Sequence, residues 1–268
     1  MSSLSPLLDG YDQVILDLDG CVWVGDDAVP GSPEAIAALR GAGKRVAFAT
    51  NNSWQSGEEQ VTRLWGLGIQ ASLADVVTVG GAVQHLLAET RSGRSAYVVG
   101  TDTLRRHVTE AGLHVLNGTD QGSRADVVVV GGTDRVDYPA LRDASLAARR
   151  GADFLATGRD PTLPMPDGPW PGTGALLAAI ETASGCTAEI VGKPSARLME
   201  TALDRLGDGR TLVVGDRLDS DVAAASAAGL DAALVLSGPS TGEAAKDTPA
   251  PVATADTLAD LVGVTVEA

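Results

Sequence analysis

Short, uninterrupted apolar segments alternate with alanine- and leucine-rich segments along almost all of the 268 residues. Eight of the apolar segments lack the polar–apolar alternation of a half-exposed strand, so we expect strands that are buried on both faces of a parallel sheet. The alternation of such strands with helices predicts an α/β fold with right-handed crossovers. The expected strands cover residues 13–19, 45–52, 96–100, 125–132, 152–158, 188–192, 211–216 and 232–236.

The segments between these strands carry helix start and stop signals. In the first, Ser32 precedes Pro33 and glycines follow the last apolar residue, which predicts a helix with Ser32 as its N-cap. Residues 88–186 hold three expected strands and helices of their own, so we expect a second α/β domain inserted into a core of residues 1–87 and 187–268. The expected helices cover residues 32–43, 56–68, 137–151, 172–185 and 221–230.

The charge balance and the cysteine content narrow the classes of partner and compartment. The formal net charge is −15, which disfavours nucleic acids and anionic membranes because both are bound through basic surfaces. Two cysteines, Cys21 and Cys186, form no disulfide framework and fit a reducing compartment. We see neither a basic leader nor a run of 18 apolar residues, and we expect a cytoplasmic protein.

Three of the expected strands end in polar residues. Asp17 and Asp19 close the first strand, Thr50 and Asn51 the second, and Asp216 the seventh. Ligands of open parallel sheets gather at the carboxyl ends of the strands, so this coincidence predicts a site. Taken alone, "DLDG" is equally compatible with an acidic turn, and acids at a helix start are an ordinary capping and dipole effect.

Lys193 is unusual in the basic composition of the chain. Lysine occurs only three times (Lys44, Lys193 and Lys246), whereas arginine occurs 17 times. A lysine in "VGKPS" therefore favours a site that needs a compact point charge; the alternative is an ordinary surface lysine. The three histidines lie outside all of these polar stretches, so carboxylates would have to supply acid–base chemistry.

Read together, "DLDG" (17–20), "TNN" (50–52), "GKP" (192–194) and "GDRLDSD" (215–221) resemble the motifs of the haloacid dehalogenase superfamily of phosphohydrolases. The long segment between the second and third motifs is similar to the class IIA capped subclass, with its NagD-like, nitrophenylphosphatase-like and phosphoglycolate- or glycerol-phosphate-phosphatase-like enzymes. The resemblance implies a Rossmann-like doubly wound parallel sheet with an inserted α/β cap. It also implies a Mg²⁺-dependent phosphatase that works through an aspartyl-phosphate.

The same resemblance implies roles for the motif residues. Asp17 would be the nucleophile, and Asp19 would protonate the leaving alcohol and then accept a proton from water. Lys193 would neutralise Asp17 and the phosphate, and together with Leu18, Thr50 and Asn51 it would bind the phosphoryl oxygens. The implied metal ligands are Asp17, the backbone carbonyl of Asp19, and Asp216, with Asp221 supporting the ion through water.

Three residues near the motifs have simpler interpretations. Asp219 falls between the two acids of the last motif, and we expect it to be a helix N-cap. Trp23 is interpreted as a hydrophobic anchor rather than a substrate contact. Cys21 is expected to pack in the core, and its sensitivity to oxidation is a further hypothesis.

The loop that resembles the specificity loop of the cap covers residues 156–174, and its prolines and glycines predict an irregular, stiff segment. Arg159 would either meet a second anionic group of the substrate or pair with Asp160 on the surface. Leu163 lies where pyridoxal-phosphate-directed relatives tend to carry a histidine, which favours a small aliphatic phosphate such as glycerol or glycolate phosphate. Asp160 and Leu163 join Arg159 as candidate specificity residues.

Other functions remain open from the sequence. Within the same family the alternative is a nucleotide or sugar-phosphate phosphatase. From a different class, the chain could be a phosphoryl-accepting binding or signalling module without turnover, although receiver modules of that kind are about half as long. Alanine-rich, acidic cap helices could also form a homodimer face.

Overall fold

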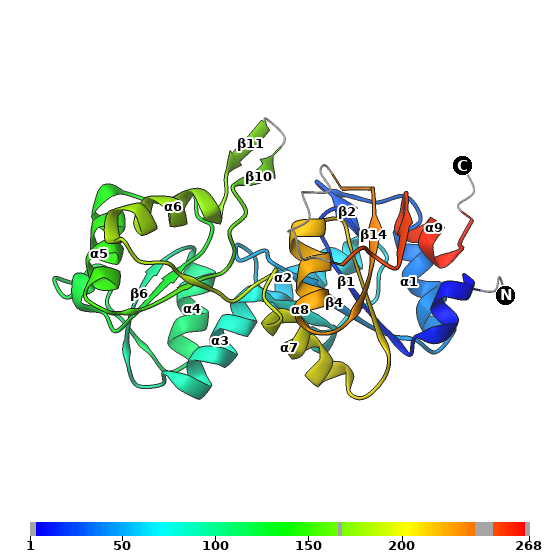
Figure 1. Ribbon diagram of the computed structural model, residues 1–268, viewed down its shortest axis with the longest axis horizontal. Helices are drawn as coiled ribbons and strands as arrows, with labels where there is room; N and C mark the ends of the chain where they lie inside the picture. Colours follow the sequence, from blue (N-terminus) through cyan, green and yellow to red (C-terminus); the bar gives the residue numbers. More distant parts are fainter. Residues whose placement is uncertain (1–3, 166–167, 239–248, 266–268) are drawn as a thin grey trace. The chain divides into compact units, whose positions relative to one another are not determined.

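The computed structural model describes residues 4–165, 168–238 and 249–265, and it divides the chain into two compact units (Figure 1). Within the described residues, the first unit takes in the chain up to Thr50, Gly57–Val77, and the chain from Lys193 onward. The second unit consists of Asn51–Ser56 and Thr78–Gly192. Each unit has its own sheet, and the α/β fold predicted from the alternating segments is confirmed.

The sheet of the first unit places β1 at its topological switch point. Its order is β15-β14-β13-β1-β4-β5, and β1 pairs in parallel with both β13 and β4. Chain segments that follow β1 therefore lead to opposite edges of the sheet, the arrangement in which a ligand crevice forms at the strand ends. The strands are β1 (Gln13–Leu16), β4 (Arg45–Thr50), β5 (Val76–Thr78), β13 (Thr211–Gly215), β14 (Asp231–Val235) and β15 (Ala253–Ala255).

Helices cover both faces of this sheet. On one face α1 (Ser32–Gly41) packs beside α9 (Leu258–Val262), and on the other α7 (Arg197–Leu206) contacts β1, β4 and α8 (Ala223–Ala227). Helix α2 (Gly57–Gly66) belongs to the same unit.

The start of α1 differs from the prediction. Gly31, with a φ of 76°, is the N-cap, so the expectation that Ser32 caps this helix is wrong. Ser32 lies inside the helix, and its buried hydroxyl donates instead to the carbonyl of Val22 at 2.7 Å. A positive φ favours glycine, which explains why the chain enters the helix at Gly31.

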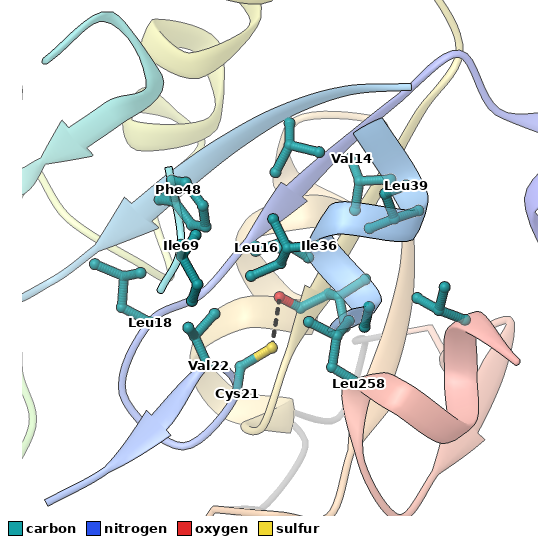
Figure 2. Close-up of a cluster of buried hydrophobic side chains, with 14 of the residues drawn as sticks. Val14, Leu16, Leu18, Cys21, Val22, Ile36, Leu39, Phe48, Ile69 and Leu258 are labelled. Carbon is teal, nitrogen blue, oxygen red and sulfur yellow. Dashed lines mark hydrogen bonds between the residues drawn. The ribbon is translucent and has the colours of Figure 1, made fainter. Parts of the chain in front are cut away.

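Alternate residues of β1 build the core of the first unit. Figure 2 shows Val14 and Leu16 directed toward Ile36 and Leu39 of α1, within one buried cluster. Because successive strand residues point to opposite faces, Ile15 faces the other helix layer. Cys21 is fully buried in the cluster, 3.9 Å from the carbonyl of Val214, so its predicted packing role is confirmed.

The second unit repeats the same construction on a smaller scale. Its parallel sheet has the order β12-β9-β8-β6-β7, from β6 (Ser95–Val99), β7 (His114–Val115), β8 (Val127–Val130), β9 (Asp153–Ala156) and β12 (Glu189–Ile190). Apolar side chains of α5 (Tyr138–Arg149) and α6 (Thr173–Ser184) pack on β8 in a second buried cluster. Helices α3 (Val79–Thr90) and α4 (Asp102–Glu110) pack against each other.

Several short elements complete the structure. The 3₁₀ turns are η1 (Pro6–Gly10), η2 (Leu73–Asp75) and η3 (Gly122–Arg124), and η4 (Leu218–Val222) is a π-helical turn. Two antiparallel hairpins join β2 (Trp23–Val24) to β3 (Asp27–Ala28) and β10 (Thr162–Met165) to β11 (Gly168–Pro171). The second hairpin lies in the loop expected to be irregular, so that part of the prediction is wrong.

Each of the eight expected strands overlaps an observed strand, and each of the five expected helices contains an observed helix. Helices α3, α4, α7 and α9 were not expected, and neither were strands β2, β3, β5, β7 and β15. The sequence range 88–186 lies within the second unit, with residue 88 inside α3, and its assignment as a cap domain stays a prediction. None of the helices in the described residues is long and apolar enough to cross a membrane.

Candidate active site

The ends of β1 and β13 bring two aspartates together. Asp17 follows β1 directly, and its backbone N–H donates to the carbonyl of Val214 in β13 at 2.8 Å. Asp216 follows β13, so adjacent parallel strands deliver both carboxylates to the same edge of the sheet. Asp17 is 8% exposed and Asp216 3%, which means that both charges lie almost out of water.

Gly20 lets the chain turn away without disturbing this pair. Its φ of +92° lies in the region that favours glycine. A Cβ at this position would overlap the carboxylate of Asp216. The turn is held by the Gly20 N–H, which donates to the carbonyl of Trp23 at 2.7 Å, and by the Ser237 hydroxyl, which donates to the Gly20 carbonyl at 2.7 Å.

Lys193 links Asp17 to a third aspartate, Asp221. Its Nζ donates to Asp17 Oδ1 at 2.5 Å, to Asp221 Oδ1 at 2.6 Å and to the carbonyl of Ala49 at 3.2 Å. Burial alone would lower the pKa of Lys193, but the carboxylates of Asp17 and Asp221 outweigh it and raise the pKa. Lys193 is therefore a buried, permanently charged ammonium, and the surface-lysine alternative is wrong.

The third aspartate is placed by the π-helical turn η4. Asp221 is 1% exposed, and its Oδ2 accepts the backbone N–H of Arg217 at 3.2 Å. Gly215 is needed beneath it, because a Cβ there would overlap the Asp221 side chain. Asp219 lies inside η4 and pairs with Arg217 through two bonds of 2.7 and 3.0 Å, so the expectation that it caps a helix is wrong.

The cluster carries more negative than positive charge. Three carboxylates against the Lys193 ammonium leave two negative charges when all are ionised. Burial raises the pKa of Asp17 well above its usual value; Lys193 opposes this, and the neighbouring carboxylates of Asp221, Asp216 and Asp19 add to it. Burial, followed by the charge of Asp221, raises the pKa of Asp216 to about 7.

A hard divalent cation fits this arrangement. Asp17, Asp216 and Asp221 each offer a carboxylate oxygen, and the three oxygens lie within 4.8 Å of one another. Oδ1 of Asp216 is buried and has no hydrogen-bond partner among the described residues. Carboxylate oxygens are ligands that Mg²⁺ prefers, and a cation would both occupy the open oxygen and balance the excess charge.

Asp19, by contrast, is an exposed residue. Its Oδ1 accepts the indole N–H of Trp23 at 2.9 Å, and its Oδ2 lies 3.5 Å from the hydroxyl of Thr50, which is buried at the end of β4. The "DLDG" segment thus supplies one buried and one accessible carboxylate, while the side chain of Leu18 between them is buried in the core. Such a pair suits a nucleophile and a proton shuttle, because only the second must reach a leaving group or water.

Comparison with known proteins identifies the fold family. A family model described as haloacid dehalogenase-like hydrolase matches residues 14–114, and a related HAD-hydrolase-like model matches residues 190–261. Acid sugar phosphatase of Staphylococcus aureus is 33% identical over 235 residues, which cover 87% of this chain and 89% of that protein. The chain belongs to the haloacid dehalogenase-like hydrolase family.

Two findings concern a mycobacterial member of the family. D-glycerol 3-phosphate phosphatase of Mycobacterium tuberculosis is 39% identical over 230 residues, 85% of this chain but only 64% of that protein's length. A crystal structure of a glycerol phosphate phosphatase from the same organism, in complex with magnesium, superposes with a TM-score of 0.87 at 35% identity. It covers 98% of this chain and 79% of the chain compared.

In this haloacid dehalogenase-like hydrolase, six of the predicted residues converge in the first unit: Asp17, Asp19, Thr50, Lys193, Asp216 and Asp221. Asn51 belongs to the second unit, where its side chain borders Gly158 and Gly192. A Cβ at Gly158 would lie 3.5 Å from Asn51 Nδ2 and 3.0 Å from Asp160 Oδ2. Gly158 thus leaves room between these two polar side chains.

The other predicted specificity residues lie within the second unit. Arg159 forms a two-pronged salt bridge with Glu181 at 2.7 and 3.0 Å, so it does have an ion pair, but not with Asp160. Glu181 Oε1 also accepts the backbone N–H of Ala188, directly before β12, at 2.9 Å. Leu163 lies in β10, in register with Trp170 of β11, and its side chain lies outside the described part of the structure.

The sequence did not reveal the polar contact of Trp23. Its ring is fully buried, which confirms the interpretation as an anchor, but its N–H also reaches Asp19. No periodicity or composition signal could have found this bond, because the direction of an indole N–H depends on the turn that places the ring.

Proposed function

We propose that this hydrolase is a Mg²⁺-dependent phosphatase that acts on phosphomonoesters of small metabolites through an aspartyl-phosphate on Asp17. The observation that carries the proposal is the buried cluster of Asp17, Asp216 and Asp221 around Lys193 at the ends of β1 and β13. An acidic turn of purely structural origin would not bury three carboxylates, because burying charge is costly unless it is paired or binds metal.

Asp17 and Asp19 divide the reaction between them. An Asp17 oxygen attacks phosphorus, the ester P–O bond breaks, and Asp19 gives its proton to the departing alkoxide. Water then attacks the phosphorus of the aspartyl-phosphate while Asp19 takes the water proton, and the bond to Asp17 breaks to release inorganic phosphate. Burial raises the pKa of Asp17 and the ammonium of Lys193 opposes that rise, so Lys193 favours the carboxylate form that attacks phosphorus.

Mg²⁺ would be held by Asp17, Asp216 and the backbone carbonyl of Asp19, with Asp221 supporting it through water. Bound there, the cation supplies charge neutralisation for the transferring phosphoryl group. The hydroxyl of Thr50, the backbone at Leu18, Asn51 and Lys193 are the proposed phosphoryl-binding groups. The magnesium complex of the mycobacterial glycerol phosphate phosphatase supports this choice of metal.

For the substrate we propose glycerol phosphate or a phosphoglycolate-like compound, selected by residues 88–186 acting as a cap. The named activity of the mycobacterial relative supports it, although this chain spans only 64% of that protein. The Staphylococcus aureus relatives make sugar phosphates the alternative. Asp160, Leu163 and Arg159, which is paired with Glu181, remain the proposed specificity residues.

The proposal extends to the setting of the enzyme. We propose a cytoplasmic enzyme that binds neither nucleic acid nor membrane, and the net charge of −15 supports this. A homodimer formed through the cap is part of the same proposal.

Phosphate release tests the mechanism. The purified chain is incubated with Mg²⁺ and glycerol phosphates, phosphoglycolate or sugar phosphates, and inorganic phosphate is measured. We expect turnover in wild type and its loss in Asp17→Asn. The matched control is Asp219→Asn, which changes an acid of the same motif that is paired with Arg217 and should retain turnover. An active Asp17→Asn variant contradicts the mechanism, and a protein that takes up one phosphoryl group and keeps it is the signalling module instead.

A further inference from the structure

Within the described residues, the buried side chain of Trp23 makes one hydrogen bond, and its acceptor is the carboxylate of Asp19. The ring is fully buried in the core of the first unit, and Nε1 donates to Asp19 Oδ1 at 2.9 Å. Asp19 and Trp23 also form a backbone bridge, closed by the bond from the Gly20 N–H to the Trp23 carbonyl. Backbone and side chain of Trp23 therefore fix Asp19 together.

The chemistry of the indole determines what this bond does. An indole N–H can donate a hydrogen bond but cannot accept one. Oδ1 of Asp19 must then act as an acceptor whether the carboxyl group is protonated or not. The proton that Asp19 exchanges is left to Oδ2, the oxygen that lies 3.5 Å from the hydroxyl of Thr50.

The ring itself is held in place from its other side. The guanidinium of Arg63, on α2, lies 4.2 Å from the ring centroid in a cation–π contact. Arg63 also donates to the carbonyl of Gly25, in the loop between β2 and β3. Arg63 therefore connects the β2–β3 hairpin, which carries Trp23, to helix α2. This contact limits the movement of the indole N–H away from Asp19.

We propose that Trp23 is a positioning residue for Asp19, holding Oδ1 so that Oδ2 is the oxygen that gives and takes the proton. This inference rests on the proposed role of Asp19 as the proton shuttle. Trp23 touches neither phosphorus nor the leaving group, so it acts on the rate only through Asp19. Its removal should affect reactions that need a proton donor more than reactions that do not.

Two phosphate esters separate these reactions. The leaving group of glycerol 3-phosphate is an alkoxide that must be protonated. The leaving group of 4-nitrophenyl phosphate is a stabilised phenolate, which needs no proton. With Trp23→Phe we expect kcat/KM to fall roughly tenfold more for glycerol 3-phosphate than for 4-nitrophenyl phosphate. This difference is a part of the rate enhancement of roughly 10²- to 10⁴-fold that a positioned general acid contributes. A merely structural role for Trp23 predicts equal losses for both esters.

A control variant and a substitute variant accompany Trp23→Phe. Trp65→Phe removes an indole N–H that bonds the carbonyl of Ala71 in the same unit, and it should not discriminate between the esters. If Trp23→Phe fails to fold, Trp23 is replaced by 3-benzothienylalanine, whose ring keeps the indole shape but carries sulfur in place of the N–H; the same discrimination is expected.

Asp19→Asn, assayed beside these variants, tells the two proposals apart. If Asp19→Asn discriminates strongly between the esters and the Trp23 variants do not, the positioning role is overturned and the mechanism stands. If Asp19→Asn keeps full activity on glycerol 3-phosphate, the assignment of Asp19 as proton shuttle fails, and the role of Trp23 fails with it.

Discussion

At the scale of single residues, Lys193 balances two buried carboxylates, and its removal should affect stability as well as catalysis. In Lys193→Met, Asp17 and Asp221 keep their burial but lose their shared ammonium. Leaving buried charge without its partner costs about 3–5 kcal/mol, so we expect a loss of this size in the free energy of unfolding at neutral pH. The deficit should shrink as the pH falls, because the carboxylates then take up protons. Urea unfolding at several pH values measures it.

Lys44→Met is the matched control. Lys44 is only partly buried, and its Nζ donates to the carbonyls of Leu8 and Tyr11 rather than to carboxylates. This variant should lose about 0.5–1.5 kcal/mol for each hydrogen bond, with no comparable dependence on pH between 5 and 7. Equal losses and equal pH profiles in the two variants would contradict the special role of Lys193.

These residues also show what could be predicted from the sequence and what could not. Lys193 was found because lysine is rare in this chain, and Asp17 because a charge at the end of an apolar strand needs an explanation. The partner of Arg159 was missed because Glu181 is 22 residues away, and sequence neighbours such as Asp160 are the natural guess. Contacts set by tertiary packing leave no local pattern.

At the scale of elements, the turn after β1 determines whether Asp216 can approach Asp17. In Gly20→Ala the new methyl group would overlap the Asp216 carboxylate, in addition to the strain of a φ of +92°. Strain of this kind costs about 1–3 kcal/mol. We expect a loss of stability at or above that range together with weaker Mg²⁺ binding, measured by thermal unfolding and by calorimetric titration.

Gly25→Ala, in the β2–β3 hairpin that follows this turn, provides the comparison. Gly25 also has a positive φ, of 58°, but a Cβ there would meet nothing within 4 Å. Its cost should be limited to the backbone strain of about 1–2 kcal/mol, with unchanged Mg²⁺ affinity. Weakened Mg²⁺ binding in this variant would show that the hairpin as a whole, and not the space beside Asp216, governs the metal site.

Elements were predictable where burial imposes a pattern. Most strands of the two sheets lie in continuous apolar runs and could be found directly, whereas β5, β7 and β15 were missed. Helix α4 was missed because seven of its nine residues are polar or charged and only Leu104 and Val108 are buried. Hairpin β10–β11 was missed because prolines occupy both strands, a composition that argues against a ladder of backbone hydrogen bonds.

At the scale of the whole molecule, the excess negative charge of the site should make stability depend on pH and on Mg²⁺ together. Burial raises the pKa of Asp216 to about 7 in the metal-free protein, above the value of about 4 expected when unfolded. The folded state then holds a proton that the unfolded state has released, so this contribution to stability is complete below pH 4 and is lost as the pH rises to 7.

Mg²⁺ should reverse this loss, because it binds the ionised carboxylates of the folded state and displaces the proton. We expect the rise in melting temperature on adding Mg²⁺ to a chelator-treated sample to be small at pH 5 and larger at pH 7.5. In Asp216→Asn the rise should be strongly reduced at both pH values, since the open buried oxygen no longer belongs to a carboxylate. A rise that is the same at both pH values, or that survives Asp216→Asn unchanged, would place the stabilising cation elsewhere on this acidic protein.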